Sequence, residues 1–190
     1  MTQAPDTAWP DRVLADPAEL ADVLGVPATD GKLLFALRAA SRRFRGATGW
    51  QISAVAGQTF RLDGDGTRTL LLPTGHVTAV TSVTVRGTPW AEDADYMWSE
   101  AGILTAIGCL WPRWYRSVAA VVDHGYDPVP EDVQEVVLDQ AQAMFNAAPG
   151  VQQVTSGSES VSFGTAATVG VTAQWTAAVA RYQIGQGDRA

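Results

Sequence analysis

The chain has 190 residues, 46% of them hydrophobic, and its 13 basic and 20 acidic residues give a formal net charge of −7. A chain of this length can bury one good core with an appended lobe or tail, and its negative charge argues against a protein that wraps DNA phosphates, without excluding a local basic patch. Its apolar stretches are far shorter than the roughly 20 residues that span a bilayer. Its polar N-terminus lacks the features of a secretory signal. Its single cysteine, Cys109, suits synthesis in a reducing cytosol.

Two helices are predicted near the N-terminus, after an arm over residues 1–15 that we expect to be flexible. The first helix, over residues 16–25, begins with Asp16 as its N-cap and ends at Gly25. The second, over residues 30–46, begins at Asp30. Apolar or small residues recur along this second helix at helical spacing: Leu33, Leu34, Leu37, Ala40, Ser41 and Phe44. Its other face carries three arginines: Arg38, Arg42 and Arg45.

A β-rich region is predicted over residues of about 50–123, because the apolar period there changes to two. A β-hairpin is expected over residues 59–72, with its turn at Asp63-Gly64-Asp65-Gly66. Further short strands are expected at Val77–Val85, Tyr96–Trp98, Ile103–Thr105 and Val118–Val122. A turn is expected at residues 86–89, directly after the first of these strands. Short strands at this spacing favour a small antiparallel sheet or sandwich over βαβ units.

A third helix is predicted over residues 130–147, where Pro130 and the acidic pair Glu131 and Asp132 suit a helix N-terminus. Residues 148–190 are expected to form an extended C-terminal arm with a short helix over about residues 174–184, and a valine-rich stretch of the arm could pair as a strand on a partner. The predicted fold class is therefore α+β: a small helical bundle with an inserted antiparallel β-sheet and hairpin region and an extended C-terminal arm.

Motifs that carry catalysis or bind a cofactor or metal are not found in the sequence. The two histidines, His76 and His124, lie apart without a cysteine cluster, and we expect a turn or solvent role for each. Asp63-Gly64-Asp65-Gly66 lacks the spacing and the closing glutamate of a calcium loop. No phosphate loop and no nucleophile elbow occurs either. The expectation is a protein that is not an enzyme and has no cofactor.

Two groups of residues are candidates for protein contacts. The arginine face of residues 38–45 is matched by an acidic stretch of the third helix formed by Glu131, Asp132, Glu135 and Asp139. These faces could be solvated, could pair within one subunit, or could meet across neighbouring subunits of a ring, where repetition would fix register. The second group is the cluster of Trp111, Trp114, Tyr115 and Arg116, whose composition fits either core packing or an interface hot spot.

The order of these elements resembles the head-to-tail connector (adaptor) proteins of long-tailed bacteriophages. The similarity covers most of residues 16–147, and the pieces that carry it follow one another along the chain: the helices over 16–25 and 30–46, Leu71-Leu72-Pro73 with its valine-rich strand, Gly102-Ile103-Leu104, Trp111-Pro112, His124-Gly125-Tyr126, and Pro130 before the last helix. The arginine-rich, lysine-poor composition would suit a phage of an actinobacterial host.

The resemblance implies a structural virion protein at the head-tail junction, made in the host cytoplasm. Such adaptors form a homo-oligomeric ring of about twelve copies below the portal protein and present a surface to a tail-side head-completion or stopper protein. DNA passes through the ring without specific binding, which the negative net charge would favour, and no membrane is involved. The resemblance also implies that the C-terminal segment contacts the portal, with Phe163, Trp175, Arg181 and Tyr182 as its anchors.

Other classes of protein remain open from the sequence. A stopper or a tail terminator would share the virion setting, although stoppers are expected to be mainly β-barrels. A monomeric binding module would use its exposed aromatic residues on one partner. A small α+β enzyme would need a pocket lined by titratable groups with shifted pKa values, and the sequence nominates none.

Overall fold

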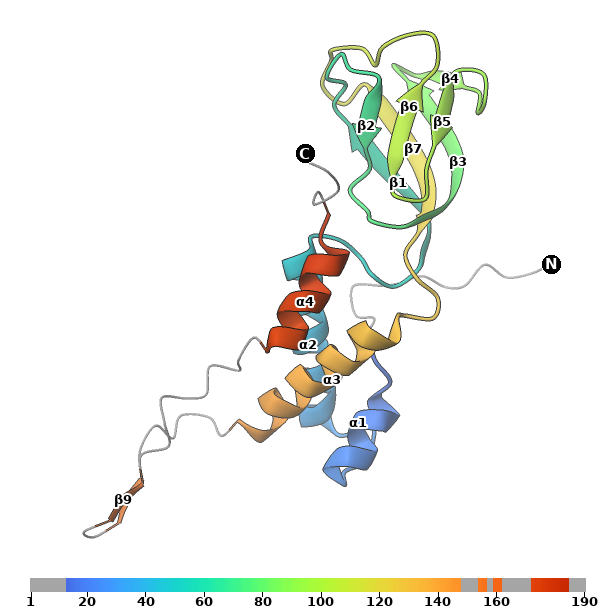
Figure 1. Cartoon of the computed structure of the whole chain (residues 1–190). Helices are drawn as coiled ribbons and strands as arrows, with labels where there is room; N and C mark the ends of the chain where they lie inside the picture. The colour runs from blue at the N-terminus through green and yellow to red at the C-terminus, as the bar shows by residue number, and fades with distance from the viewer. Residues whose placement is uncertain (1–12, 148–153, 157–158, 162–171, 185–190) are drawn as a thin grey trace, which may run out of the picture. The chain divides into compact units, whose positions relative to one another are not determined.

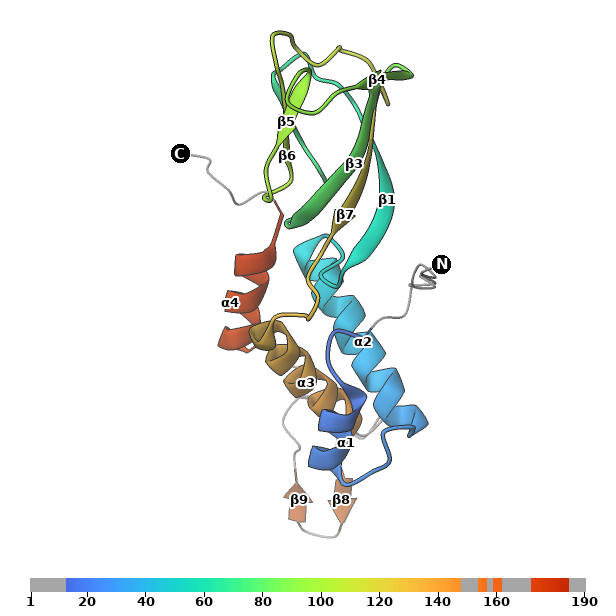
Figure 2. The ribbon, with the colours of Figure 1, turned by 90° about the vertical axis from the view of Figure 1, so that its right-hand side faces the viewer.

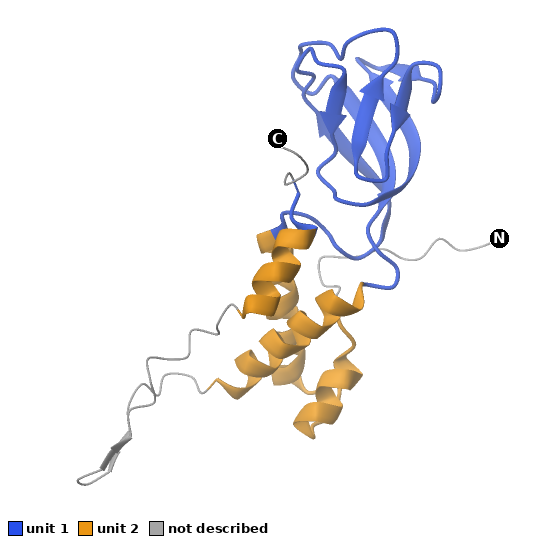
Figure 3. Cartoon of the chain, viewed as in Figure 1, with its two compact units in different colours: residues 1–7, 48–129, 182–190 blue, residues 8–47, 130–181 orange. Residues whose placement is uncertain are grey.

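The computed structural model describes residues 13–147, 154–156, 159–161 and 172–184 (Figure 1). In this part of the chain lie four helices and nine strands, so the predicted α+β class is confirmed. The chain divides into two compact units (Figure 3). The β unit comprises the described residues within 48–129 and 182–184, and the helical unit comprises those within 13–47 and 130–181. The β unit is thus inserted in the sequence between the second and third helices.

The first two helices begin and end at residues that the sequence identifies. They are α1 (Pro17–Leu24) and α2 (Gly31–Thr48). The Asp16 carboxylate accepts a hydrogen bond from the backbone N–H of Ala18 at 2.8 Å, and Gly25 ends α1 in the left-handed conformation at φ +66°. The Asp30 carboxylate accepts from the N–H groups of Lys32 and Leu33, each at 2.9 Å. Both N-caps satisfy backbone donors that a helix start leaves unpaired.

The helical unit is completed by α3 (Glu131–Asn146) and α4 (Ala173–Tyr182). Its buried side chains come from every helix and from the segment before α1: Leu14, Leu20, Leu33, Leu37, Phe44, Val133, Val137 and Trp175. The backbone N–H of Leu14 donates to the Ser41 hydroxyl at 3.0 Å. Because Leu14 and Ala15 are buried, they belong to the packed unit and not to the flexible arm expected over residues 1–15; residues 1–12 lie outside the described part.

The β unit holds two antiparallel sheets. The larger has the order β1-β7-β3-β4, formed by Val55–Leu62, Val118–His124, Val77–Val85 and Thr88–Trp90. The smaller has the order β2-β6-β5, formed by Thr69–Leu71, Ile103–Ala106 and Tyr96–Trp98. Figure 2 shows the smaller sheet lying against a face of the larger one. Every strand expected from residues 59 to 122 is present. β4 is an addition that begins within the turn predicted over residues 86–89, of which only Arg86 and Gly87 form the turn.

The core of the β unit lies between the two sheets. Buried residues of both sheets share one cluster: Leu70, Leu72, Val77, Val83, Val85, Tyr96, Leu104, Ala106, Trp111, Val118, Ala120 and Val122. Along β7 every second side chain is buried, which is the period expected for a strand with one face on a core. At about 25 cal/mol per Å² of apolar surface removed from water, this cluster is the main source of stability for the unit.

The hairpin expected over residues 59–72 is wrong. β1 pairs with β7 through Leu62 opposite Val118, and β2 pairs with β6 through Leu70 opposite Leu104. The aspartate- and glycine-rich segment at 63–66 therefore connects the two sheets instead of turning between paired strands. Local alternation identifies a strand but does not name its partner, and here the long, half-buried β7 offers β1 a continuous ladder.

Beyond α3 the structure describes β8 (Val154–Ser156) and β9 (Glu159–Val161), which pair with each other. The backbone of Val161 is thus opposite Val154 of the same chain, whereas the sequence suggested a strand on a partner. Phe163 lies outside the described residues. Among the helices of the described segments, none combines the length and the apolar character that a membrane crossing requires.

Candidate assembly surfaces

Trp111 belongs to the core of the β unit and not to a partner-facing cluster. Only 1% of its surface is exposed, its ring stacks on Trp90 with 4.9 Å between centroids, and its indole N–H donates to the Arg68 carbonyl at 2.9 Å. The buried indole with a satisfied N–H is the usual arrangement for a core tryptophan. Of the two roles that the sequence left open for Trp111, core packing is the one that its burial supports, and Trp111 is not part of a partner-facing surface.

The segment that follows it, residues 112–116, presents its aromatic side chains to solvent; we call it the aromatic loop. Trp114 is 62% exposed and Tyr115 is 89% exposed. The guanidinium of Arg86 lies over the Trp114 ring, 5.1 Å from its centroid, a cation–π distance. An exposed pair of large aromatic residues beside arginines has the composition of an interface hot spot.

The backbone of the aromatic loop is held in place by the loop that connects β1 to β2. Gly64 N–H donates to the Trp114 carbonyl at 3.0 Å, and Arg116 N–H donates to the Asp63 carboxylate at 2.6 Å. A Cβ at Gly64 would lie 1.8 Å from the Pro112 carbonyl oxygen, so only glycine permits this close approach. The loop is consequently preorganised, and its side chains are displayed on a fixed backbone.

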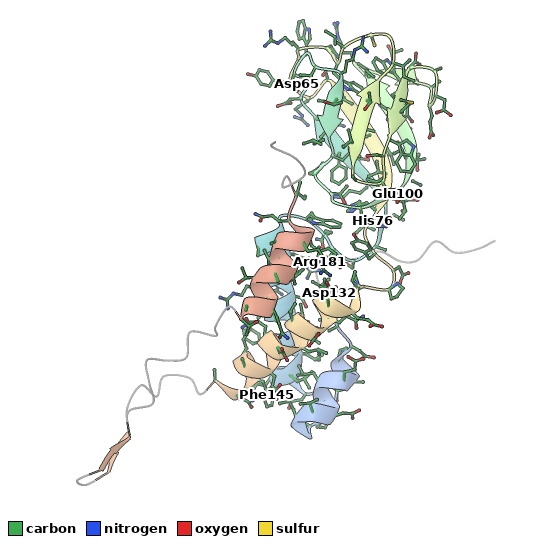
Figure 4. The ribbon with its side chains drawn as sticks, in the orientation of Figure 1. Asp65, His76, Glu100, Asp132, Phe145 and Arg181 are labelled. Atoms are coloured by element: carbon green, nitrogen blue, oxygen red, sulfur yellow. The ribbon has the colours of Figure 1, made fainter. Side chains whose placement is uncertain are left out.

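All arginines of the β unit gather at this end. They lie at the end of β1, the start of β2, the β3–β4 turn and the aromatic loop: Arg61, Arg68, Arg86, Arg113 and Arg116. Each is exposed. Asp65 lies at the same end, away from His76 and Glu100 (Figure 4), and its pKa is lowered chiefly by the hydrogen bond from the Thr67 hydroxyl. The chain is acidic overall, yet at this end of the β unit the five arginines outnumber the two neighbouring carboxylates, Asp63 and Asp65.

The arginine face of α2 and the acidic face of α3 both reach solvent in the helical unit. Arg38 and Arg42 are exposed and Arg45 is half-buried, at positions i, i+4 and i+7 of α2. On α3 three carboxylates are exposed at i, i+4 and i+8: Glu131, Glu135 and Asp139. At a rise of about 1.5 Å per residue, the arginine stripe is about 10.5 Å long and the acidic stripe about 12 Å long. They are matched in length and opposite in charge.

Of the four residues expected to anchor a portal-binding arm, the three that the structure describes, all but Phe163, belong to the packed units. Trp175 is 4% exposed and meets the Phe44 ring edge-on, with 5.3 Å between centroids. Arg181 donates to the Asp132 carboxylate at 2.8 Å, and the two side chains point toward each other in Figure 4. Tyr182 lies in the β unit, where its carbonyl accepts from the Trp50 indole N–H at 2.6 Å. The assignment of Trp175 as a portal contact is therefore corrected: it fastens α4 within its own chain.

His124 lies in the core and not in a turn or in solvent. It is 2% exposed. Its Nδ1 lies 3.0 Å from the Thr74 hydroxyl, and its Nε2 lies 2.5 Å from the Gln58 side-chain oxygen. Burial lowers the pKa of this imidazole, and the nearby Asp123 opposes the effect only in part. These contacts suit a neutral imidazole that accepts a hydrogen bond from Thr74 and donates one to Gln58.

A shallow pocket of about 330 Å³ lies beside His124, lined in part by His76, Asp123, Tyr126 and Pro128. The imidazole ring of His76 stacks on Tyr126, with 4.3 Å between centroids and 2° between planes. Among the residues that the structure describes, no group of three or more histidine, cysteine, aspartate or glutamate side chains could hold a metal ion.

No protein-family model and no curated protein matches the chain. Among solved structures, it is similar to a chain in the neck of a native gene transfer agent (GTA) particle computed with C12 symmetry, at a TM-score of 0.55 and 23% identity over 100% of both chains. It is also similar to a chain in the neck of an empty GTA particle computed with C6 symmetry, at a TM-score of 0.53 and 22% identity over 100% of this chain and 97% of that one. A third similarity, to a chain in the virion of a native GTA particle, has a TM-score of 0.53 and 22% identity over 100% and 96%. Identities of this size show a shared fold.

Proposed function

We propose that the protein is a structural subunit of the neck of a phage-like particle and acts there as the head-to-tail adaptor. The observation that carries the proposal is the agreement of fold over the whole chain with chains from GTA necks. A similarity that covers the whole of this chain and 97–100% of the other chain supports a shared role better than a match to one small unit would. The virion is then its place of action.

In this role the chain forms a ring below the portal. The twelvefold symmetry of one neck structure supports a ring of about twelve copies. The arginine stripe of α2 and the acidic stripe of α3 are proposed to meet across neighbouring copies, where they set register more than affinity, since an exposed pair contributes only about 0–1 kcal/mol. The ring contacts the portal on one side and a tail-side completion protein on the other. The negative net charge of the chain lets DNA pass through the ring without binding to it.

The role is structural and not catalytic. The pocket beside His124 contains an imidazole with both nitrogens in hydrogen bonds, and Asp123 in its lining accepts a hydrogen bond from the backbone N–H of Gly57 at 2.6 Å. Groups engaged in this way hold the strands in place, whereas a catalytic acid or base must present an atom to a substrate.

Light scattering of the full-length protein, alone and after mixing with the portal protein of the same particle, tests the proposal. We expect a species of about twelve subunits in one or both samples. A protein that stays monomeric in both would overturn the adaptor role.

A further inference from the structure

We propose that the aromatic loop of one copy seats on the outer face of the three-stranded sheet in the β unit of a second copy. The proposal deepens the ring function proposed above and rests on it. It adds an interface in the β unit to the charged stripes of the helical unit and assigns the exposed aromatic residues a partner, which is this same chain.

The receiving surface is the side of the β2-β6-β5 sheet that faces away from the core; we call it the outer sheet face. Leu70 and Leu104 are paired and buried, so their neighbours Leu71 and Ile103, also paired, lie on the opposite side. Met97 lies on this side too, since Tyr96 before it is buried. Leu71 is 61% exposed and Met97 is 50% exposed.

An apolar outer face is unusual for a small antiparallel sheet. Such sheets place one face on the core and one in water, and the wet face is normally polar. The outer sheet face instead carries Leu71, Met97 and the half-buried Ile103 across adjacent strands, and its remaining paired positions are the threonines Thr69 and Thr105. A contiguous exposed apolar patch of this kind marks a contact with another molecule.

The charges around the two surfaces are complementary. The outer sheet face is flanked by carboxylates at both ends of the edge strand β5, with Glu92, Asp93 and Asp95 before it and Glu100 after it, all exposed. The aromatic loop is flanked by three arginines, Arg86, Arg113 and Arg116, and by two carboxylates, Asp63 and Asp65. Each surface thus has an apolar centre and a rim whose net charge is opposite to that of the other, the arrangement in which charge selects the partner and apolar burial supplies the affinity.

A second copy is the occupant that this arrangement specifies, because both halves of the contact are carried by one chain. Seating the loop of one copy on its neighbour leaves that neighbour's own loop available for the next copy. This contact is heterologous, and heterologous contacts generate closed rings when the rotation closes. The preorganised backbone of the loop also lowers the ordering entropy lost on association.

Site-specific photo-crosslinking of the full-length protein tests the proposal. Tyr115 is replaced by p-benzoylphenylalanine, unlabelled and nitrogen-15-labelled subunits are mixed, and crosslinked peptides are identified by mass spectrometry. We expect mixed-isotope crosslinks from position 115 to the strands that carry Leu71, Met97 and Ile103. Thr81, exposed on β3 of the other sheet, serves as the control position and should give none to these strands. An assembled ring whose position 115 crosslinks to another surface, or to no second copy, overturns the proposal.

A matched pair of substitutions separates this inference from the ring itself. Met97→Glu places a carboxylate in the centre of the patch and should weaken assembly about tenfold or more, whereas Met97→Leu should assemble like the unaltered protein. If the unaltered protein forms a ring and Met97→Glu assembles equally well, the loop contact is refuted and the adaptor role stands. If the unaltered protein forms no ring alone or with the portal, the adaptor role is refuted and the loop contact with it.

Discussion

Trp111 and Trp114 lie three residues apart and occupy opposite environments, which makes them a matched pair for separating stability from assembly. Trp111→Ala removes a buried indole and should lower the free energy of unfolding by about 3–5 kcal/mol. Trp114→Ala removes an exposed ring and its contact with Arg86, and should cost less than about 1 kcal/mol. Urea denaturation of both variants measures the difference; equal losses would contradict the core assignment of Trp111.

His124 should make stability depend on pH. Its pKa is lowered in the folded state by burial, so at mildly acidic pH the unfolded chain binds a proton that the folded chain does not. Stability is therefore complete above the unfolded pKa of about 6.5 and falls as the pH decreases below it, by up to about 1.4 kcal/mol per pH unit from this group.

Urea denaturation of the unaltered protein and of His124→Gln measures this contribution. The urea midpoints of the two proteins are compared at several pH values between neutrality and mild acidity. The glutamine variant should lose less stability over that range, although removing the contacts with Thr74 and Gln58 lowers its stability at neutral pH. An identical pH dependence in both proteins would show that the imidazole is not buried in its neutral form.

For single residues, the alternation of side chains along a regular strand predicts burial, whereas an irregular segment offers no such signal. His124 continues the register of Val118, Ala120 and Val122, which places it on the buried side of β7; alternation extended by one step would have predicted it. The opposite exposure of Trp111 and Trp114 was not readable in the same way, because residues 112–116 are irregular and their orientation depends on bonds to a distant loop.

The packing of α4 depends on apolar contact much more than on its ion pair. Trp175→Ala removes a buried ring beside Phe44 and should destabilise the helical unit by about 3–5 kcal/mol. Arg181→Ala breaks a bond to Asp132 that lies on the surface, with the arginine side chain 70% exposed, and should cost about 0–1 kcal/mol. Hydrogen exchange over residues 173–182 should accelerate strongly in the first variant and little in the second. A larger effect of Arg181→Ala would contradict this order.

The charged stripes of α2 and α3 predict that ring assembly is sensitive to charge reversal and to salt. Arg38→Glu and Glu135→Arg should each weaken association about two- to fivefold per interface, and the double variant should recover part of the loss because opposite charges face each other again. Light scattering at low and high salt gives the readout. If neither substitution nor salt changes the assembled fraction, the stripes do not meet between copies.

For whole elements, local signals located helices and strands but not their partners. The capping residues Asp16, Asp30 and Gly25 are short-range signals, and the helices they predict are present. The pairing of β1 with β7 joins residues 56 to 69 positions apart, and nothing in the glycine-rich segment between β1 and β2 indicates that partner. The sequence did not predict the packing of α4 either, because its partner is also distant in the sequence. The composition of α4 shows that one side of the helix is apolar, but it does not show which residues cover that side.

On the scale of the whole molecule, charge is distributed unevenly. The chain carries a net charge of −7, while the cations of the β unit are concentrated beside the aromatic loop and three of the five cations of α2 form one stripe. In the proposed ring both basic surfaces are covered by acidic surfaces of neighbouring copies. The assembled ring should therefore present less positive charge to DNA than the separate subunit does.

This distribution leads to a prediction about DNA. At about 150 mM salt, we expect the assembled protein to show no measurable affinity for a short DNA duplex, because non-specific binding requires several uncompensated cations along the phosphate backbone. Fluorescence anisotropy of a labelled duplex measures this, with Glu131→Lys/Glu135→Lys as a comparison in which positive charge is added to α3. Binding by the unaltered ring, weakening steeply as salt rises, would show that basic surfaces stay exposed after assembly. It would also contradict a neck through which DNA slides, since counterion release would then hold the duplex to the wall of the channel.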